Sequence, residues 1–430
     1  MKNSIAIALL LAAPLLTNAQ FGKNLVNKIK NKAAQKAEQR ILGHADKAMN
    51  EAMDDIEGKN KPATTPAPTA NNEPTQKAAA ESVTAYSKFD FIPGEKIIYA
   101  EDFSQESIGE LPLNWNTTGK GAVVTMKEFG GNWLRMYQNS VYLTSNKTAF
   151  PKDYTVEFDL VLQFNYKSYT LPLVTFGLLS SGELEPTDNI LMNTPATFHS
   201  AQVQLRPYNN GTSSISFASF LEKKDYFKGQ DQQMSSLENY YNKPAHIAMQ
   251  VQGSRLRVWI NHEKAFDIPK AIDTKYALNQ LFFKIHNSGY KEDQIGFYIS
   301  NLKVAAGLPD TRHKLIEERS FSTTGILFDI ESSVIKPASF GIIKEIAGVL
   351  KENPSVKIKI VGHTSSDGDD ASNLELSKKR AAAVKNALVT TYAIDAARIT
   401  TEGKGETEPV ADNNTKEGKA LNRRVAFIKI

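Results

Sequence analysis

The sequence predicts a multidomain protein in which an all-β sandwich precedes a small α/β domain, with a helical segment and a disordered linker ahead of both. Its 430 residues exceed the usual size of one domain. Apolar side chains recur at every second position through much of residues 90–305, as they do in strands with one buried face. From Ser320 onward, strand-like and helix-like patterns alternate, which is typical of an α/β unit.

The first residues have the features of an export signal. Lys2 precedes a short apolar run that ends at Leu16, and small residues follow up to Ala19. An uncleaved membrane anchor is the alternative, but the run is shorter than the ~20 apolar residues that usually cross a bilayer. We therefore expect residues 1–19 to be a signal peptide and the mature protein to lie outside the cytoplasm.

Two segments of unusual composition follow the signal. In residues 20–57 apolar side chains recur at three- or four-residue steps, which predicts an amphipathic helix. It is either a solvated, marginal helix or a segment that touches a membrane or a partner helix. Residues 58–89 are rich in Pro, Thr and Ala and nearly lack large apolar side chains. Such a segment buries too little surface to offset its ordering entropy, so it is predicted to be a disordered linker.

The predicted sandwich spans residues 90–305. Its alternating runs are separated by turn signals such as Gly130-Gly131 and Gly253-Ser254. A polar connector is expected at 306–319, and residues 320–430 are expected to form the α/β domain, which is long enough to bury its own core.

Composition excludes several kinds of function. Lys and Arg number 51 against 47 Asp and Glu, and a net charge of +4 is too small to indicate nucleic-acid binding. The absence of cysteine excludes disulfides, thiol catalysis and Cys-ligated metals. Seven histidines leave little material for a His-based metal centre. We therefore expect no cofactor and no metal site.

Three C-terminal motifs stand in order: LFDIESSVIKP at 327–337, GHTSSDGDDASNLELSKKRAAAV at 362–384 and NNTKEGKALNRRVAF at 413–427. Together they make residues 320–430 resemble the peptidoglycan-associating domain of the OmpA family. The resemblance implies a non-catalytic domain that grips the diaminopimelate of cell-wall stem peptides, in the periplasm or at the outer membrane of a Gram-negative bacterium.

Diaminopimelate presents a carboxylate and an ammonium, so its pocket needs a fixed cation and a fixed anion. Arg380 can supply a planar, bidentate carboxylate contact; its alternative is a surface ion pair with a nearby acid. Family members carry Asp directly after Gly-His-Thr, but this chain has Ser365 there. Either Asp367 or Asp369 partly replaces the missing carboxylate, or ligand affinity is weaker or its specificity altered.

Three further residues of the motifs are candidates for the pocket. Thr364 belongs to the Gly-His-Thr motif, and Asp329 either borders the pocket or forms a turn before Ser332. Of the two arginines that follow Asn422, Arg424 is predicted to reach the pocket, and the other is expected to pack against a carboxylate.

Residues 96–305 are more loosely similar to concanavalin-like jelly rolls, including laminin-G-type modules. That resemblance implies two stacked antiparallel sheets, often with sugar on the concave face. Retaining glycosidases on this fold use Glu-x-Asp-x-x-Glu on one strand. Here Glu157 and Asp159 begin the pattern, but Leu162 replaces the last carboxylate, and an ordinary solvent-facing strand explains the two acids equally well.

The sequence therefore predicts a non-enzymatic envelope protein that binds peptidoglycan and presents a β-sandwich for another glycan or an envelope protein, with association to the outer membrane. One alternative is an OmpA-type outer-membrane β-barrel protein with residues 90–305 as the barrel. Another is a carbohydrate-active enzyme with a wall-binding appendage.

Overall fold

The computed structural model describes residues 90–165, 170–193, 199–261 and 263–430. The predicted signal peptide (1–19), helical segment (20–57) and linker (58–89) lie outside the described residues. Residues Tyr86–Ile430 form one compact unit. Within the described ranges, no helix has the length and apolar character needed to cross a membrane.

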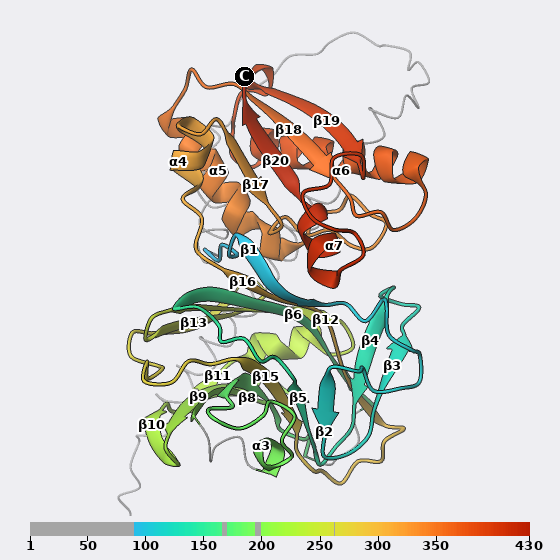
Figure 1. Ribbon diagram of the computed structural model, residues 1–430, viewed down its shortest axis with the longest axis vertical. Coiled ribbons are helices and arrows are strands. Elements are labelled where there is room, and N and C mark those ends of the chain that lie inside the picture. Colours follow the sequence, from blue (N-terminus) through green and yellow to red (C-terminus); the bar gives the residue numbers. More distant parts are fainter. Residues whose placement is uncertain (1–89, 166–169, 194–198, 262) are drawn as a thin grey trace, which may run out of the picture. The chain divides into compact units, whose positions relative to one another are not determined.

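Strands β1 to β16 form two antiparallel sheets (Figure 1). The first sheet has the order β14-β13-β12-β6-β16-β4-β3, with β1 paired to β16, and its strands are β1 (Lys96–Glu101), β3 (Gly121–Thr125), β4 (Asn132–Met136), β6 (Asp153–Phe164), β12 (Pro244–Gln252), β13 (Arg255–Ile260), β14 (Glu263–Ile268) and β16 (Ile295–Ala306). The second has the order β10-β9-β8-β7-β15-β5-β2, with β11 paired to β9, and its strands are β2 (Trp115–Thr117), β5 (Ser140–Thr144), β7 (Val174–Ser180), β8 (His199–Arg206), β9 (Ser214–Leu221), β10 (Lys224–Lys228), β11 (Gln232–Gln233) and β15 (Gln280–Ile285). A short helix, α3 (Ile190–Asn193), and the 3-10 turn η2 (Ser235–Tyr240) lie in the connections.

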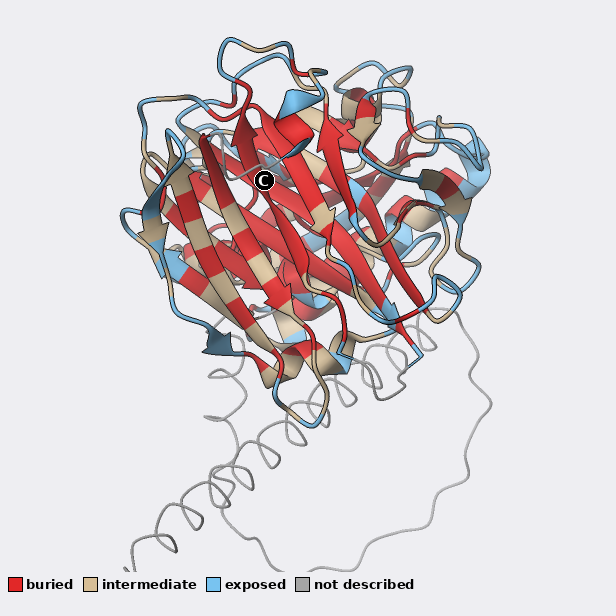
Figure 2. Ribbon diagram, turned by 90° about the horizontal axis from the view of Figure 1, so that it is seen from below, coloured by how far each residue is buried: buried red, intermediate tan, exposed pale blue. Residues whose placement is uncertain are grey.

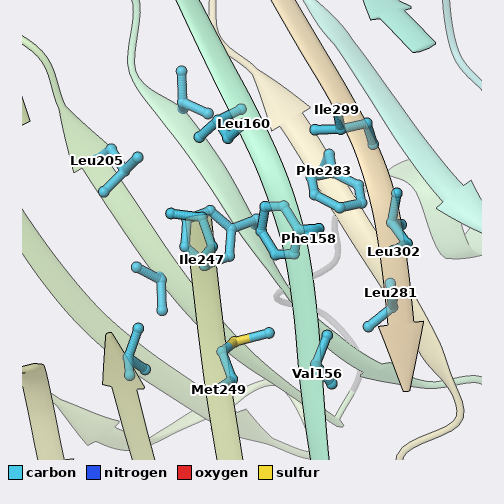
Figure 3. Close-up of a cluster of buried hydrophobic side chains, with 14 of the residues drawn as sticks. Val156, Phe158, Leu160, Leu205, Ile247, Met249, Leu281, Phe283, Ile299 and Leu302 are labelled. Carbon is cyan, nitrogen blue, oxygen red and sulfur yellow. The ribbon is translucent and has the colours of Figure 1, made fainter. Parts of the chain in front are cut away.

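The two sheets share one hydrophobic core, so residues 90–306 form a sandwich rather than the single closed sheet of the barrel alternative. Figure 3 shows the apolar side chains of β6 and β12 meeting those of β8, β15 and β16. The period-two prediction is confirmed: in β6, for example, Tyr154, Val156, Phe158, Leu160 and Leu162 all lie in this core.

The expectation of a solvent-facing side for β6 is wrong. Glu157 and Asp159, on the other side of β6, are each only 3% exposed. Figure 2, seen from below, shows that buried residues also predominate along the central strands of the second sheet. His246 of β12 lies between them, with Nε2 3.3 Å from Glu157 and Nδ1 2.8 Å from Asp159. Lys303 lies 3.3 Å from Glu157, and Lys336 lies 3.4 Å from Asp159. We call these five residues the β6 charge cluster.

Part of the C-terminal domain covers this side of the sheet. Lys336 belongs to that domain, and its neighbour Ala338 packs against Ala248 and Trp259 of the sandwich. The side chains of β6 are therefore buried on both sides, which is why its acids need internal partners.

The C-terminal domain has a four-stranded sheet in the order β17-β20-β18-β19. β18 and β19 are parallel, and the other pairs are antiparallel. Its elements are α4 (Thr311–Ile316), β17 (Ser320–Thr323), η3 (Pro337–Ser339), α5 (Phe340–Glu352), β18 (Ile358–His363), α6 (Asp370–Thr390), η4 (Ala396–Arg398), β19 (Ile399–Gly405), α7 (Lys416–Asn422) and β20 (Val425–Lys429). This is the predicted small α/β domain (Figure 1).

Candidate functional site

The candidate site lies where β18 ends and α6 begins. Two glycines allow α6 to pack directly on the strands: a Cβ atom on Gly362 would lie 2.2 Å from the carbonyl oxygen of Ser377, and one on Gly403 would lie 2.4 Å from the amide nitrogen of Lys378. No larger residue fits at either place without moving the helix. The helix turn that carries Arg380 is therefore held at a fixed height above the sheet.

The loop between β18 and α6 is tied to the helix by side-chain bonds. Asp369 caps α6, since its carboxylate accepts a hydrogen bond from the amide of Ser372 at 3.0 Å. Gly368 has φ +92°, which favours glycine. Asn373 donates to the carbonyl oxygens of Asp367 at 2.9 Å and Ser365 at 3.4 Å. Because Asp369 is used as the helix cap, Asp367 is the nearer candidate for the site's anion.

Arg380 is a half-buried cation held by neutral groups. Its Nε donates to the carbonyl oxygen of Ser332 at 2.9 Å, and Nη2 donates to that of Asp329 at 3.4 Å. Its guanidinium carbon lies 4.9 Å from the centre of the Phe328 ring. Burial, assisted by the positive charge of Arg423, lowers the pKa of Arg380 to about 10, so it stays charged at neutral pH.

The surface ion pair considered as the alternative role of Arg380 is not formed. Glu375 pairs with Lys378 at 2.6 Å, and Glu406 accepts from the side chain of Asn373 at 2.5 Å. Among the described residues, no acidic side chain forms an ion pair with Arg380.

Asp367 carries the negative charge of the site. The Ser365 hydroxyl donates to it at 2.9 Å, Lys419 Nζ lies 2.6 Å away and Arg423 Nη1 lies 3.6 Å away. Partial burial acts to raise the pKa of Asp367, but the bonds from Lys419 and Ser365 outweigh it and lower that pKa. The carboxylate is ionised at neutral pH and shared between two cations, while its side chain is still 51% exposed.

Ser365 and Thr364 lie against the site but bring no charge. Ser365 is 4% exposed, and its hydroxyl donates a hydrogen bond to the carboxylate of Asp367. Thr364 is buried, and its amide donates to the carbonyl oxygen of Gly405 at 2.8 Å. The described residues offer no hydrogen-bond partner to its hydroxyl. Both residues therefore shape the loop rather than supply an ion.

Asp329 contributes its backbone instead of its carboxylate. Its carbonyl oxygen accepts from Arg380 and also from the amide of Ser332 at 3.1 Å, which closes a turn. The carboxylate lies 3.6 Å from Lys336. Asp329 thus takes both predicted roles, bordering the site and forming the turn.

The pocket role of Arg424 stays a prediction, while Arg423 packs against the carboxylate of Asp102, as expected for the other of the two arginines. Arg424 donates to the carbonyl oxygen of Glu408 at 3.0 Å. Burial together with the Arg424 charge lowers the pKa of His363 to about 4, so that histidine is neutral. Arg423 points instead toward Asp367 and acts on Arg380. Arg423 and Arg424 both lie in the short segment between α7 and β20, and their side chains reach different partners there.

Three further residues of this neighbourhood were not predicted from the sequence: Asp102, Asn373 and Lys419. The last two lie inside the C-terminal motifs, in the first turn of α6 and in α7. Asp102 belongs to the sandwich, and its Oδ2 lies 3.2 Å from Arg423 Nη2. In the sequence, nothing marks it as a neighbour of a residue more than three hundred positions away.

Across the residues that the structure describes, no group of three or more His, Asp and Glu could hold a metal ion. A separate pocket of about 490 Å³ is lined in part by Asp90, Arg255, Lys264 and Asp267. These four charged side chains already pair with each other, Arg255 with Asp267 at 2.7 Å and Lys264 with Asp90 at 2.6 Å.

Residues 327–423 match the model of the OmpA family. The C-terminal part of this chain is an OmpA family domain. It is 45% identical over 100 residues to outer membrane porin F of Pseudomonas aeruginosa, covering 23% of this chain and 29% of that protein. It is 35% identical over 103 residues to the peptidoglycan-binding protein ArfA of Mycobacterium bovis, covering 24% of this chain and 31% of that protein.

Among solved structures, the peptidoglycan-associated lipoprotein from Burkholderia pseudomallei is similar, with 29% identity and a TM-score of 0.24, over 27% of this chain and 92% of that one. The chain spans about a third or less of the length of the two curated relatives above. The family match covers residues 327–423 and does not include the sandwich.

Proposed function

We propose that this protein is a non-enzymatic envelope protein that binds peptidoglycan, with Arg380 holding a carboxylate of the diaminopimelate stem residue. The observation that carries the proposal is the state of Arg380, a half-buried guanidinium that meets carbonyl oxygens and a ring but forms no ion pair with a described acid. A buried charge without a counterion is costly, and a ligand carboxylate would remove that cost. The family match and the similarity to the peptidoglycan-binding protein ArfA of Mycobacterium bovis support peptidoglycan as the binding partner.

The ligand's ammonium would be received by Asp367. This is the site's exposed carboxylate, and Ser365, which takes the place of the family's Asp, only donates a hydrogen bond to it. Because Lys419 and Arg423 already share Asp367, its attraction for an ammonium is weakened. The proposed site is therefore strong in its carboxylate half and weak in its ammonium half.

The rest of the chain fits the same proposal. Residues 1–19 would direct export, and 20–57 with the linker 58–89 would tether the folded part in the periplasm or at the outer membrane. The sandwich, expected at 90–305, would be of the concanavalin-like jelly-roll type, and the connector at 306–319 would join it to the wall-binding domain at 320–430. We propose that the sandwich presents a surface for a second glycan or an envelope protein.

Co-sedimentation of the mature chain with purified peptidoglycan tests the proposal. Arg380→Ala should reduce the bound fraction at least tenfold, since a charge-assisted contact contributes about 1.5–3 kcal/mol. Lys378→Ala is the matched control, because it removes a cation from the exposed side of the same helix and breaks only a surface pair with Glu375. Equal binding by both variants and the unmodified chain would refute the proposed role of Arg380.

A further inference from the structure

We propose that the sandwich completes the wall-ligand site, because Asp102 supplies the negative charge that is missing at Ser365. With this charge, the site selects a zwitterionic amino acid over a dicarboxylate that has no amines. This inference rests on the proposed function and assigns to the sandwich a part in ligand selection. Asp102 acts through Arg423 and is therefore a positioning residue.

Asp102 is a fixed carboxylate at the end of β1. Its Oδ1 accepts hydrogen bonds from the amide of Ser104 at 3.0 Å and from the Ser104 hydroxyl at 2.7 Å. Its Oδ2 is left for Arg423, whose Nη2 lies 3.2 Å away. Through its other terminal nitrogen, Nη1, Arg423 lies 3.6 Å from Asp367. One guanidinium thus links the acid of the sandwich to the acid of the wall-binding domain.

The contacts between β1 and α7 hold Asp102 in this position. Lys416 of α7 lies 2.7 Å from Glu101 and 2.5 Å from Glu106. Glu417 accepts a hydrogen bond from the amide of Ala100 at 3.1 Å. Beneath these polar contacts, Ile97, Ala100 and Ala305 of the sandwich form one buried apolar cluster with Ala420. These ion pairs and the buried apolar cluster together favour one fixed position of β1 against α7.

A second part of the sandwich supports the loop that holds Arg380. Gly130 and Gly131 lie in the turn between β3 and β4, and a Cβ atom on either would lie within 3.1 Å of Ile330 Cδ1. Ile330 is in the loop whose carbonyl oxygens, from Asp329 and Ser332, accept from Arg380. The sandwich therefore contacts the surroundings of both Arg380 and Arg423.

The balance of charge explains why Asp102 matters for selectivity. Within the wall-binding domain, Lys419 and Arg423 both pair with Asp367, and the positive charge of Arg423 also acts on Arg380. A site with that excess attracts any carboxylate and disfavours an ammonium. Asp102 neutralises Arg423 from outside the domain and leaves Asp367 more available to a ligand ammonium. Removing the Asp102 charge should harm a zwitterion and help a dicarboxylate.

Competition against peptidoglycan provides the test, with meso-diaminopimelate and pimelate as probes, since pimelate has the same carbon chain without the two amines. For each probe, one measures the concentration that releases half of the mature protein from sedimented peptidoglycan. Asp102→Asn should shift the ratio of the two concentrations about tenfold in favour of pimelate. Asp102→Glu keeps the charge and should keep the ratio, which separates charge from folding.

Two further variants sharpen the test. Ser365→Asp in the Asp102→Asn background should restore the preference for diaminopimelate, because it returns one carboxylate beside Asp367. Asp225→Asn removes an exposed charge from β10 in the other sheet and should leave the ratio unchanged. An unchanged ratio in Asp102→Asn, or the same shift in Asp225→Asn, would overturn the inference while leaving the proposed function standing. Retained sedimentation of Arg380→Ala would refute the proposed function itself.

Discussion

The β6 charge cluster and the surroundings of Arg380 differ in whether their charged side chains form ion pairs. In the cluster, Glu157 and Asp159 are buried and each is paired with His246 and a lysine. Arg380 is half-buried, is held by carbonyl oxygens and forms no ion pair with any described acid. Charges that are all paired with one another stabilise the fold, whereas a desolvated cation that has no ion-pair partner among the described residues is suited to a ligand.

The largest expected effect is on stability, in the β6 charge cluster. Asp159→Ala removes the partner of His246, Lys336 and Asn301, whose amide donates to Asp159 at 2.9 Å. Breaking one side of a buried ion pair should lower the free energy of unfolding by about 3–5 kcal/mol. Urea unfolding measures it, with the exposed Asp225→Asn as control, expected within about 0.5 kcal/mol of the unmodified protein. Equal losses in both variants would show that the cluster is not a structural element.

A smaller effect should appear with pH. Burial acts to lower the pKa of His246, but the bonds to Asp159 and Glu157 outweigh it and raise that pKa. Because the pKa is raised on folding, the charged histidine contributes its full stabilisation below the unfolded pKa of about 6.5. This contribution is lost as the pH rises through the pKa of the folded protein.

The difference in unfolding free energy between the unmodified protein and His246→Gln should therefore shrink by about 1 kcal/mol or more from pH 6 to pH 9. The acids of the cluster act in the opposite direction. The pKa of Glu157 and that of Asp159 are lowered by their cationic partners against the effect of burial, so their contribution is lost only as pH falls below about 4. Urea unfolding at both pH values measures the change, and a growing difference toward pH 9 would contradict this assignment.

Substitution of Arg380 should have the smallest effect on the free energy of unfolding and the largest effect on peptidoglycan binding. Arg380→Met keeps the apolar contact with Phe328 and removes a buried charge, so the free energy of unfolding should change by less than about 1 kcal/mol. Peptidoglycan sedimentation should nevertheless be lost. If Arg380→Met unfolds as readily as Asp159→Ala, the two regions do not differ in the way described above.

Local pattern predicted the sandwich core and the place of Arg380. The alternation in β6 and β12 reflects side chains that point to opposite faces, a rule that depends on neighbours in sequence alone. The motif around Arg380 likewise lies within one strand, loop and helix. The structure then distinguished Asp367 from Asp369, because only the second is used to cap α6.

What the sequence did not reveal depends on contacts between distant segments. The outer side of β6 was expected to face solvent because nothing in that strand indicates that Lys336 will reach Asp159. Asp102 and Arg423 meet only through the packing of β1 on α7. The choice between Arg423 and Arg424 required the direction of each side chain in the short segment between α7 and β20.

The most direct test of the central claim is a crystal structure of the protein with meso-diaminopimelate. We predict a ligand carboxylate within about 2.7–3.2 Å of the Arg380 guanidinium, with the ligand ammonium turned toward Asp367. A guanidinium that keeps its bonds to the carbonyl oxygens of Ser332 and Asp329, with the ligand bound elsewhere or not at all, would contradict it.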